Sequence, residues 1–295
     1  MAMLFLFIDG FGIGEQDTAK NPVYSANAPN IGRIFDTFRL FPTDATLGVP
    51  GLPQSATGQT AIFTGVNAPA LIGRHLSGQP TASLRNIIIG NNLFKALTGI
   101  GLRVTNANVY RDEYLQRMLD PEERKYRPSV TSVMTMSAGV PFRNVKEFND
   151  GLGVYHDITG QILAEYGYDA IVITPEEAAQ RLYKISRNYD FTLFEHFLPD
   201  IIGHTGDMEK ALAEINLLDT FLGHILEAFD LNEDIVFIAS DHGNIEDMSV
   251  KTHTCNRVPT LIGGRIPGDI GIRIGTLMDI MPAVLNILSK KSLPV

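Results

Sequence analysis

The sequence has little of what a disulfide-stabilised, membrane-spanning or nucleic-acid-binding protein needs. Cys255 is the only cysteine among 295 residues, which excludes an intrachain disulfide and suits a reducing compartment. No apolar run approaches the roughly 20 residues of a membrane-spanning helix. Lys and Arg number 24 against 33 Asp and Glu, a net charge of -9, which argues against binding nucleic-acid phosphates or an anionic membrane surface. We therefore expect no nucleic-acid partner and no membrane, with the oligomeric state left open.

The N-terminal residues also lack the features of a secretion signal. Residues 1–8 are apolar, but no basic residues precede them and Asp9 interrupts the run. We interpret this segment as a buried strand and expect a cytoplasmic protein. The apolar fraction of 44% is ample for a packed core, and the length permits one large α/β domain or two smaller ones.

Short apolar runs that end in polar residues predict the strands. Met3–Ile8, Asp190–Phe197 and Asp234–Ser240 each have this form, and Leu102–Val109 is a fourth candidate. Continuous apolar runs of this length, closed by turn residues, are typical of fully buried parallel strands.

Amphipathic segments between these runs predict helices. Met208–Phe229 carries apolar residues at helical spacing, with Asp207 as N-cap. A second helix is predicted over 175–187, with Thr174 as its cap and a proline at its first position. A third covers Thr276–Leu288. Strands that alternate with helices indicate an α/β fold with a mostly parallel central sheet and helices on both faces.

The middle of the chain differs from the rest. Residues 68–150 are rich in arginine and are broken by Pro and Gly. We interpret 68–150 as a small inserted cap or subdomain beside the sheet, and 1–67 with 151–295 as the α/β core.

Three predicted strands deliver carboxylates to one edge of the sheet. Asp9, Asp200 and Asp241 follow the ends of three apolar runs. The carboxyl ends of parallel strands line the ligand crevice of open α/β sheets, and carboxylates gathered there repel one another unless a cation intervenes.

Three of the seven histidines occur beside these acids, namely His204, His242 and His253. Three Asp and three His suit Zn or Mn, and they exceed the needs of one catalytic ion. They are enough for two divalent ions about 3.5 to 4 Å apart, an arrangement that stabilises displacement at phosphoryl or sulfuryl esters. Any one of these residues alone has a structural alternative, such as a turn cap for Asp9 or a surface histidine for His204.

A nucleophile is predicted at Ser55. The residues after Ser55 are apolar enough to form a helix, so the hydroxyl would lie at a helix N-terminus, where an anion is favoured. The alternative is that Ser55 or Thr57 only caps this helix.

Together these motifs resemble the alkaline phosphatase superfamily, and most closely the branch of cofactor-independent phosphoglycerate mutase and phosphopentomutase. The family's first metal-binding Asp corresponds to Asp9, and its nucleophile, placed before a Gly and a Thr-Gly pair, to Ser55. Its Asp-x-x-x-His motif corresponds to Asp200 and His204. Its Asp-His-Gly-Asn motif and its last His, before Val-Pro, correspond to Asp241, His242, Gly243, Asn244 and His253.

The resemblance implies that Asp200, His204 and His253 hold one ion and that Asp9, Asp241 and His242 hold the other. Two features depart from the branch. Only about 130 residues separate Gly65 from Asp200, too few for the large mutase insert, and Gln59 replaces the usual His of the nucleophile loop. The Cys-x-Pro-x-Arg motif of formylglycine sulfatases is absent around Ser55.

The leading hypothesis is a metal-dependent phosphohydrolase, a phosphomonoesterase or phosphodiesterase, that acts on a small-molecule phosphate ester through a phosphoseryl intermediate on Ser55. The alternatives are a phosphomutase that returns the phosphoryl group to its substrate, and a metal-binding protein that has lost catalysis. Arginine presents a two-pronged fork to phosphate. The candidates for substrate binding are therefore Thr57, Arg74, Arg85 and Arg257.

Overall fold

The structure, a computed structural model, describes residues 1–120, 122–123, 125–266 and 271–289. Its centre is a six-stranded sheet in the order β2-β6-β5-β1-β4-β3. Strand β1 (Met3–Ile8) lies in the middle, parallel to both β4 (Phe191–His196) and β5 (Ile235–Ala239). Strand β3 (Val104–Asn106) pairs in parallel with β4. The predicted α/β fold with a mostly parallel sheet is confirmed.

Two further strands extend the sheet beyond β5. Strand β6 (Val258–Gly264) runs antiparallel to β5, and β2 (Arg39–Thr43) runs antiparallel to β6. Neither was predicted from the sequence. Each contains a proline, and Pro42 lies opposite Pro259 in the register. Proline removes a ladder donor and therefore weakens the sequence signal of a strand.

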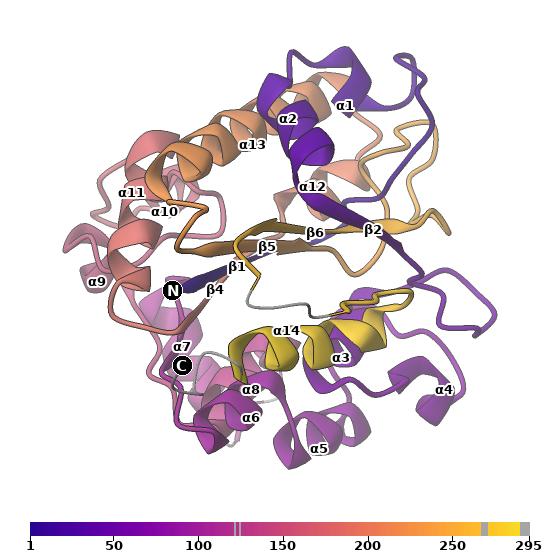
Figure 1. Ribbon diagram of the computed structural model, residues 1–295. Helices are drawn as coiled ribbons and strands as arrows, with labels where there is room; N and C mark the ends of the chain where they lie inside the picture. Colours follow the sequence, from indigo (N-terminus) through magenta and orange to yellow (C-terminus); the bar gives the residue numbers. More distant parts are fainter. Residues whose placement is uncertain (121, 124, 267–270, 290–295) are drawn as a thin grey trace.

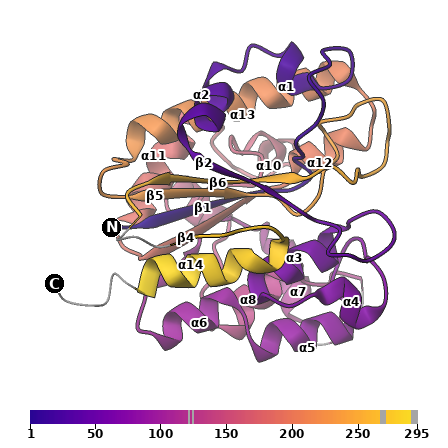
Figure 2. The same ribbon diagram turned by 45° about the vertical axis from the view of Figure 1, so that its right-hand side comes forward.

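Helices cover both faces of the sheet (Figures 1 and 2). Above it in Figure 1 lie α1 (Pro22–Ser25), α2 (Pro29–Thr37), α10 (Gln161–Glu165), α11 (Pro175–Ser186), α12 (Leu198–Gly203) and α13 (Met208–Ala228). Below it lie α3 (Ser55–Thr64), α4 (Ala68–Ile72), α5 (Ala82–Gly90), α6 (Leu93–Gly99), α8 (Val130–Ser137) and, after the short 3₁₀ turn η1 (Leu277–Asp279), α14 (Ile280–Ser289). Helices α7 (Asp112–Leu119) and α9 (Val145–Asn149) complete the described elements.

The central strand explains why both layers are needed. Every residue of β1 is buried. Phe5 and Phe7 belong to the apolar cluster on one face of the sheet, whereas Leu4 and Leu6 belong to the cluster on the other. Successive side chains of a strand point to opposite faces. A run without alternation, such as residues 3–8, can therefore be stable only when helices cover both faces.

The predicted helices form with their predicted caps. The Asp207 side chain accepts hydrogen bonds from the backbone N–H groups of Glu209 and Lys210 at the start of α13, and Thr174 accepts one from Glu177 at the start of α11. The segment predicted as one helix over 276–288 is instead η1 followed by α14. None of the helices in the described part of the chain is both long and apolar enough to cross a membrane.

Residues 68–150 contribute to the lower layer as well as to the sheet. Strand β3 is part of the sheet, and α5 and α8 pack on each other and on α3. Ile88, Phe94, Val104 and Met134 belong to the same apolar cluster as Phe5. The expected division into a core and a cap at residues 67 and 151 stays a prediction, and these contacts connect much of the segment directly to the core.

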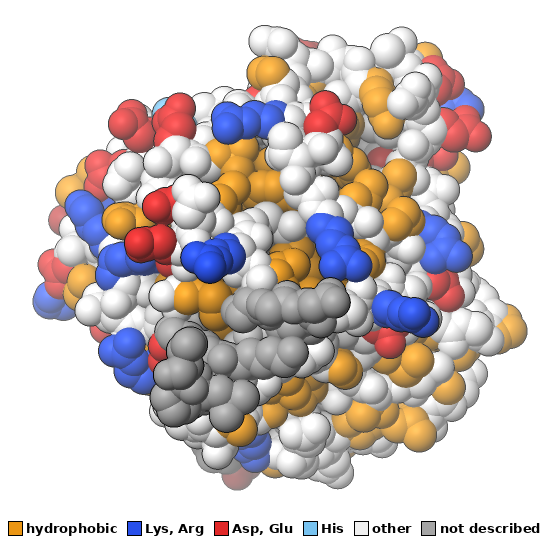
Figure 3. Space-filling model, in the orientation of Figure 1, with side chains coloured by type: hydrophobic (Ala, Val, Ile, Leu, Met, Phe, Trp, Pro, Cys, Tyr) orange, Lys and Arg blue, Asp and Glu red, His pale blue; other side chains and the backbone are white. Residues whose placement is uncertain are grey.

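The outer surface carries both signs of charge. On the face drawn in Figure 3, Lys and Arg side chains lie interspersed with Asp and Glu, and apolar side chains fill the space between them. Neither sign of charge is gathered into one field on this face.

Candidate functional site

The three predicted aspartates lie together at the carboxyl edge of the sheet. Asp9 directly follows β1, Asp241 follows β5 after one residue, and Asp200 lies in α12, just after β4. Gly10 allows this convergence, because its φ is +72° and a Cβ there would lie 2.7 Å from the Asp200 Cα. Only glycine combines this conformation with so close an approach.

The first group of candidate ligands is Asp200, His204 and His253, whose ligand atoms all lie within 4.8 Å of one another. The Asp200 Oδ1 lies 3.2 Å from His253 Nε2 and 3.4 Å from His204 Nε2. Each imidazole Nδ1 faces a backbone carbonyl, at 2.9 Å from Lys251 O for His204 and at 2.7 Å from Pro53 O for His253. Because a carbonyl only accepts, Nδ1 carries the proton in both rings and Nε2 presents a lone pair.

The two Nε2 atoms lie only 3.0 Å apart. Two lone pairs at this distance repel each other unless a proton or a cation lies between them. Backbone carbonyls that fix the tautomer in this way are the usual partners of metal-binding histidines. The donor set of this group therefore fits a divalent ion.

The second group is Asp9, Asp200 and His242. The His242 Nε2 lies 3.2 Å from Asp9 Oδ1, and His242 Nδ1 lies 3.4 Å from the Gly243 carbonyl oxygen. Asp9 Oδ1 is buried and has no hydrogen-bond partner in the described part of the chain. An unpaired, buried carboxylate oxygen is costly, so this atom also fits a ligand of an ion. Asp200 belongs to both groups, which places the two candidate sites next to each other.

Asp241 lies beside the second group. Its Oδ2 is 3.7 Å from His242 Nε2, and its Oδ1 accepts a hydrogen bond from the His242 backbone N–H at 3.1 Å. The structure thus brings all six predicted ligands together, although Asp200 takes the place in the second group that the resemblance gave to Asp241. The roles of all six as ligands stay predictions.

The acids respond to this crowding in their pKa values. Burial, together with the neighbouring carboxylates, raises the pKa of Asp9 and that of Asp241 well above the usual range of aspartate. For Asp200 burial also acts to raise the pKa, but the nearby His253 and His242 and a hydrogen bond from Asn244 outweigh it and lower the pKa to about 2. The charged forms of Asp9 and Asp241 therefore carry a cost that a bound cation would reduce.

Ser55 is the first residue of α3, and its Oγ lies 3.0 Å from His242 Nε2. The N-cap position of α3 belongs to Gln54, so the alternative that Ser55 or Thr57 is merely the N-cap is wrong. The Thr57 hydroxyl instead donates to the Gln54 carbonyl and accepts from the Leu76 N–H. The Ser55 hydroxyl thus lies at the positive end of a ten-residue helix and beside the second candidate group.

Gln59, one turn further along α3, also points into the cluster. Its Nε2 donates to Asp9 Oδ2 at 3.0 Å and to Asp241 Oδ2 at 3.2 Å. The residue that departs from the family pattern therefore connects two of the predicted ligands through one oxygen of each carboxylate.

The predicted arginines do not line the cavity at the site. A cavity of about 410 Å³ opens beside Ser55, Asp9 and Asp200, and neither Arg74, Arg85 nor Arg257 lines it. Arg85 donates to the Pro80 carbonyl and Arg257 to the Pro42 carbonyl. Thr57 is fully buried, with its hydroxyl occupied. The structure gives no support from this cavity to these four as substrate-binding residues.

Other residues line the cavity that the sequence did not single out. Glu195 and Phe197 lie at the end of β4, so their place in the predicted strand 190–197 was a usable signal. The segments after β3 and before α10 carried no comparable signal. They supply Asn108, Tyr110, Arg111, Tyr114, Tyr155 and His156.

Glu195 is the buried acid of this cavity. Its Oε2 accepts a hydrogen bond from the Thr131 hydroxyl at 2.6 Å, and its backbone is held by Asn108 from both sides. Burial raises its pKa to about 7, against the lowering effect of Thr131. A carboxyl with this pKa is partly protonated at neutral pH.

Glu195→Gln is therefore expected to change how stability depends on pH in the metal-free protein. Folding raises the pKa of Glu195. Its contribution to the free energy of unfolding is therefore complete below the pKa of the unfolded chain and is lost as pH rises through about 7. Through this group the free energy of unfolding of the wild type should fall by about 2 to 3 kcal/mol between pH 5 and pH 8, and the variant should not show this fall. Urea unfolding of both proteins at several pH values measures this, and parallel pH profiles would contradict it.

Comparison with known proteins places this site in a family. Residues 1–292 match the Metalloenzyme superfamily. The chain belongs to the Metalloenzyme superfamily. Members of this superfamily are enzymes that bind divalent metal ions, in agreement with the two candidate ligand groups of the structure.

Sequence relatives carry the name of one branch. The chain is 36% identical to the 2,3-bisphosphoglycerate-independent phosphoglycerate mutase of Desulforudis audaxviator over 106 residues. The match covers 34% of this chain and 21% of that protein. The mutase of Mycoplasmopsis synoviae is 26% identical over 184 residues, which cover 60% of this chain and 34% of that protein. The chain thus matches only about a fifth to a third of the length of these curated relatives.

Solved structures share the fold at low sequence identity. Leishmania mexicana phosphoglycerate mutase, determined at low cobalt concentration, superposes with a TM-score of 0.62 at 11% identity, over 98% of this chain and 95% of that one. The alkaline phosphatase of the Antarctic bacterium TAB5 gives 0.57 at 13% identity, over 99% of both chains. The predicted alkaline phosphatase-like fold is confirmed.

Proposed function

We propose that this protein is a metal-dependent phosphohydrolase of small-molecule phosphate esters, with Ser55 as its nucleophile. The observation that carries the proposal is the position of the Ser55 hydroxyl. It lies at the N-terminus of α3, 3.0 Å from His242 Nε2, and beside two adjacent groups of candidate metal ligands. A hydroxyl in these surroundings is activated as a nucleophile and aligned for attack on phosphorus.

Two divalent ions, Zn or Mn, are proposed as the cofactors. Asp200, His204 and His253 would hold one, and Asp9 and His242, with Asp200 or Asp241, the other. When bound, the ions neutralise charge on the phosphoryl oxygens and lower the pKa of the nucleophile. The buried oxygen of Asp9 without a partner and the facing Nε2 atoms of His204 and His253 support this occupancy.

The chain's own groups then perform a two-step displacement. Ser55 Oγ forms a bond to phosphorus while the bond from phosphorus to the leaving oxygen breaks. The proton lost by the Ser55 hydroxyl is matched by the one that the leaving alcohol gains. Water then attacks the phosphoseryl group, which releases inorganic phosphate and returns a proton to Ser55. The N-terminal N–H groups of α3 favour the anionic phosphoryl group in both steps.

A phosphomutase is the second candidate, favoured by the name of the curated relatives. It would retain the phosphoseryl group and return it to the same substrate. Metal-loaded protein incubated with phosphate esters distinguishes the two. Free phosphate that accumulates in proportion to alcohol supports hydrolysis, whereas an isomerised ester without free phosphate supports the mutase. Saturation with metal but no turnover of any phosphate, phosphonate or sulfate ester would support the third candidate, a metal-binding protein without catalysis.

Gln59→Ala is expected to weaken metal binding. The amide of Gln59 orients Asp9 and Asp241 through their Oδ2 atoms, and its loss leaves two buried carboxylates without their shared donor. Removing such a supporting group typically costs about 10- to 100-fold in metal affinity. Competition with a metal-binding dye measures the change, with Gln180→Ala in the exposed part of α11 as control. Equal affinities for Gln59→Ala and wild type would show that Gln59 does not orient the ligands.

A further inference from the structure

The cavity beside Ser55 is larger than a phosphoryl group needs. Its volume is about 410 Å³, in the range of pockets that take a whole small ligand. Ser55, Asp9 and Asp200 line one part of it, and Arg111, Tyr155 and Phe197 belong to the rest of its wall. The space next to the nucleophile is therefore available to the remainder of an ester.

Aromatic rings make up much of that wall. Tyr110, Tyr114, Tyr155, His156 and Phe197 all line the cavity. The rings of His156 and Phe197 stack at a centroid distance of 4.0 Å and an interplanar angle of 23°, and those of Tyr110 and Tyr114 stack at 6.2 Å and 12°. Rings fixed in this way form a rigid apolar surface, which favours a flat group over a flexible polar one.

The hydroxyls of two of these tyrosines are already used inside the protein. Tyr114 donates to the Arg127 carbonyl, and the Tyr110 oxygen accepts from Asn106 and Ser132. His156 differs, because its Nδ1 is buried and makes no hydrogen bond to any of the residues that the structure describes. Burial, together with His196 and Arg111, lowers the pKa of His156 to about 3, so its ring is neutral. The wall thus offers ring surfaces and one unpaired imidazole nitrogen.

Arg111 is the cation of this cavity. Its guanidinium carbon lies 4.1 Å from the centroid of the Tyr166 ring, a cation–π contact. Among the described residues, Arg111 has no ion pair. Four other arginines do have one, namely Arg103, Arg117, Arg181 and Arg187. A half-buried guanidinium that lines a cavity without a carboxylate partner favours an anion from a ligand.

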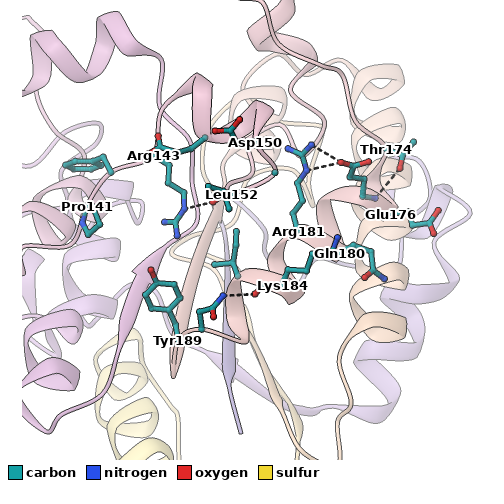
Figure 4. Close-up of a pocket in the computed structure, with 16 residues that line it drawn as sticks. Pro141, Arg143, Asp150, Leu152, Thr174, Glu176, Gln180, Arg181, Lys184 and Tyr189 are labelled. Carbon is teal, nitrogen blue, oxygen red and sulfur yellow. Dashed lines mark hydrogen bonds and ion pairs between the residues drawn. The ribbon is translucent and has the colours of Figure 1, made fainter.

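A second, larger cavity of about 940 Å³ is also lined by arginines, and their surroundings differ from those of Arg111. Arg143 and Arg181 face it from opposite sides (Figure 4). Arg181 is bound to Glu177 and to the Phe148 carbonyl, and Arg143 donates to the Leu152 carbonyl and to Thr105. Arg181 is thus paired with a carboxylate, whereas Arg143 is held by neutral acceptors, and neither Ser55 nor any of the candidate metal ligands lines that cavity.

We propose that the cavity beside Ser55 binds the leaving group of the substrate, and that this leaving group is a planar aromatic ring carrying a second anionic group, which Arg111 binds. The proposal rests on the phosphoryl-transfer function proposed above. The stacked rings select the flat group, and Arg111 selects the charge. The class of substrate is thus a phosphate ester of an aromatic acid rather than of a short aliphatic alcohol.

Three esters of primary alcohols test the proposal without large differences in leaving-group reactivity: 4-carboxybenzyl, benzyl and cyclohexylmethyl phosphate. With metal-loaded protein, kcat/KM should fall about 10-fold from the first to the second, because a charge-assisted contact is lost. It should fall about 3- to 10-fold again to the third, because a puckered ring cannot stack. Arg111→Ala should abolish the first difference and Arg111→Lys should keep part of it. Phe197→Leu should reduce the second, and Arg33→Ala on the exposed face of α2 is the matched control.

Binding of the corresponding phosphonates to metal-loaded protein, measured by calorimetry, separates this proposal from the proposed function. Absent turnover of all three esters, combined with tight binding of 4-carboxybenzylphosphonate that depends on Arg111, would overturn the function and support the inference. Turnover that depends on Ser55 but is equal for the three esters would overturn the inference and leave the function standing. Absent or equal binding of the three phosphonates would likewise overturn the inference.

Discussion

Ser55→Ala is expected to reduce turnover of phosphate esters by about 10³-fold or more while metal content stays close to that of the wild type. The Ser55 Oγ is the only atom that the substitution removes from the site, and it lies at the N-terminus of α3. The ligand atoms of both candidate groups come from other residues. The loss should therefore appear in kcat rather than in the number of bound ions.

A covalent intermediate gives this prediction a second readout. Acid-quenched wild type should contain one phosphoryl group per chain during turnover, detected by intact mass, and the variant should contain none. Ser83→Ala, at an exposed position of α5, is the matched control and should behave as wild type. Undiminished turnover by Ser55→Ala would exclude Ser55 as the nucleophile, whatever the metal content.

The core of the fold could be predicted because its strands are buried on both faces. The runs that became β1 and β5 are apolar throughout and are each followed by a polar residue, whereas β4 contains Thr192, Glu195 and His196 in a segment that is buried along its whole length. The antiparallel strands β2 and β6 could not be predicted, because Pro42 and Pro259 weaken the local sequence pattern of a strand. Their places are decided by the pairing of β6 with β5 and of β2 with β6, and a short stretch of sequence does not contain the distant contact between β2 and β6.

The candidate ligands could be found for the same reason. Asp9 and Asp241 follow strands that the sequence predicts, and parallel strands bring their ends to one edge. Arg111 and Tyr155 could not be found, because they lie in loops whose path over the site depends on tertiary packing. Arg74 and Arg85 are the converse case, since their charge suggested substrate binding and neither lines the cavity, so that their role stays a prediction.

Asp200→Asn is expected to remove more metal than His204→Ala. Asp200 Oδ1 lies 3.2 Å from His253 Nε2, and Asp200 belongs to both candidate groups, whereas His204 belongs to only one. If both groups hold an ion, His204→Ala should reduce the content from about two ions per chain toward one, and Asp200→Asn should reduce it below one. The pKa of Asp200, lowered to about 2, shows that its neighbours already favour the charged form that a ligand requires.

Elemental analysis after dialysis measures the ion content, and thermal unfolding with and without added metal gives an independent readout. Because an ion that binds only the folded state raises Tm, wild type should gain most from added metal, His204→Ala less, and Asp200→Asn least. His224→Ala, on α13, is the control for loss of an imidazole. Equal ion content in Asp200→Asn and His204→Ala would show that Asp200 does not serve both groups. If Asp200→Asn retained two ions, Asp200 would not be a ligand. The first candidate group would then consist of His204 and His253 without a carboxylate.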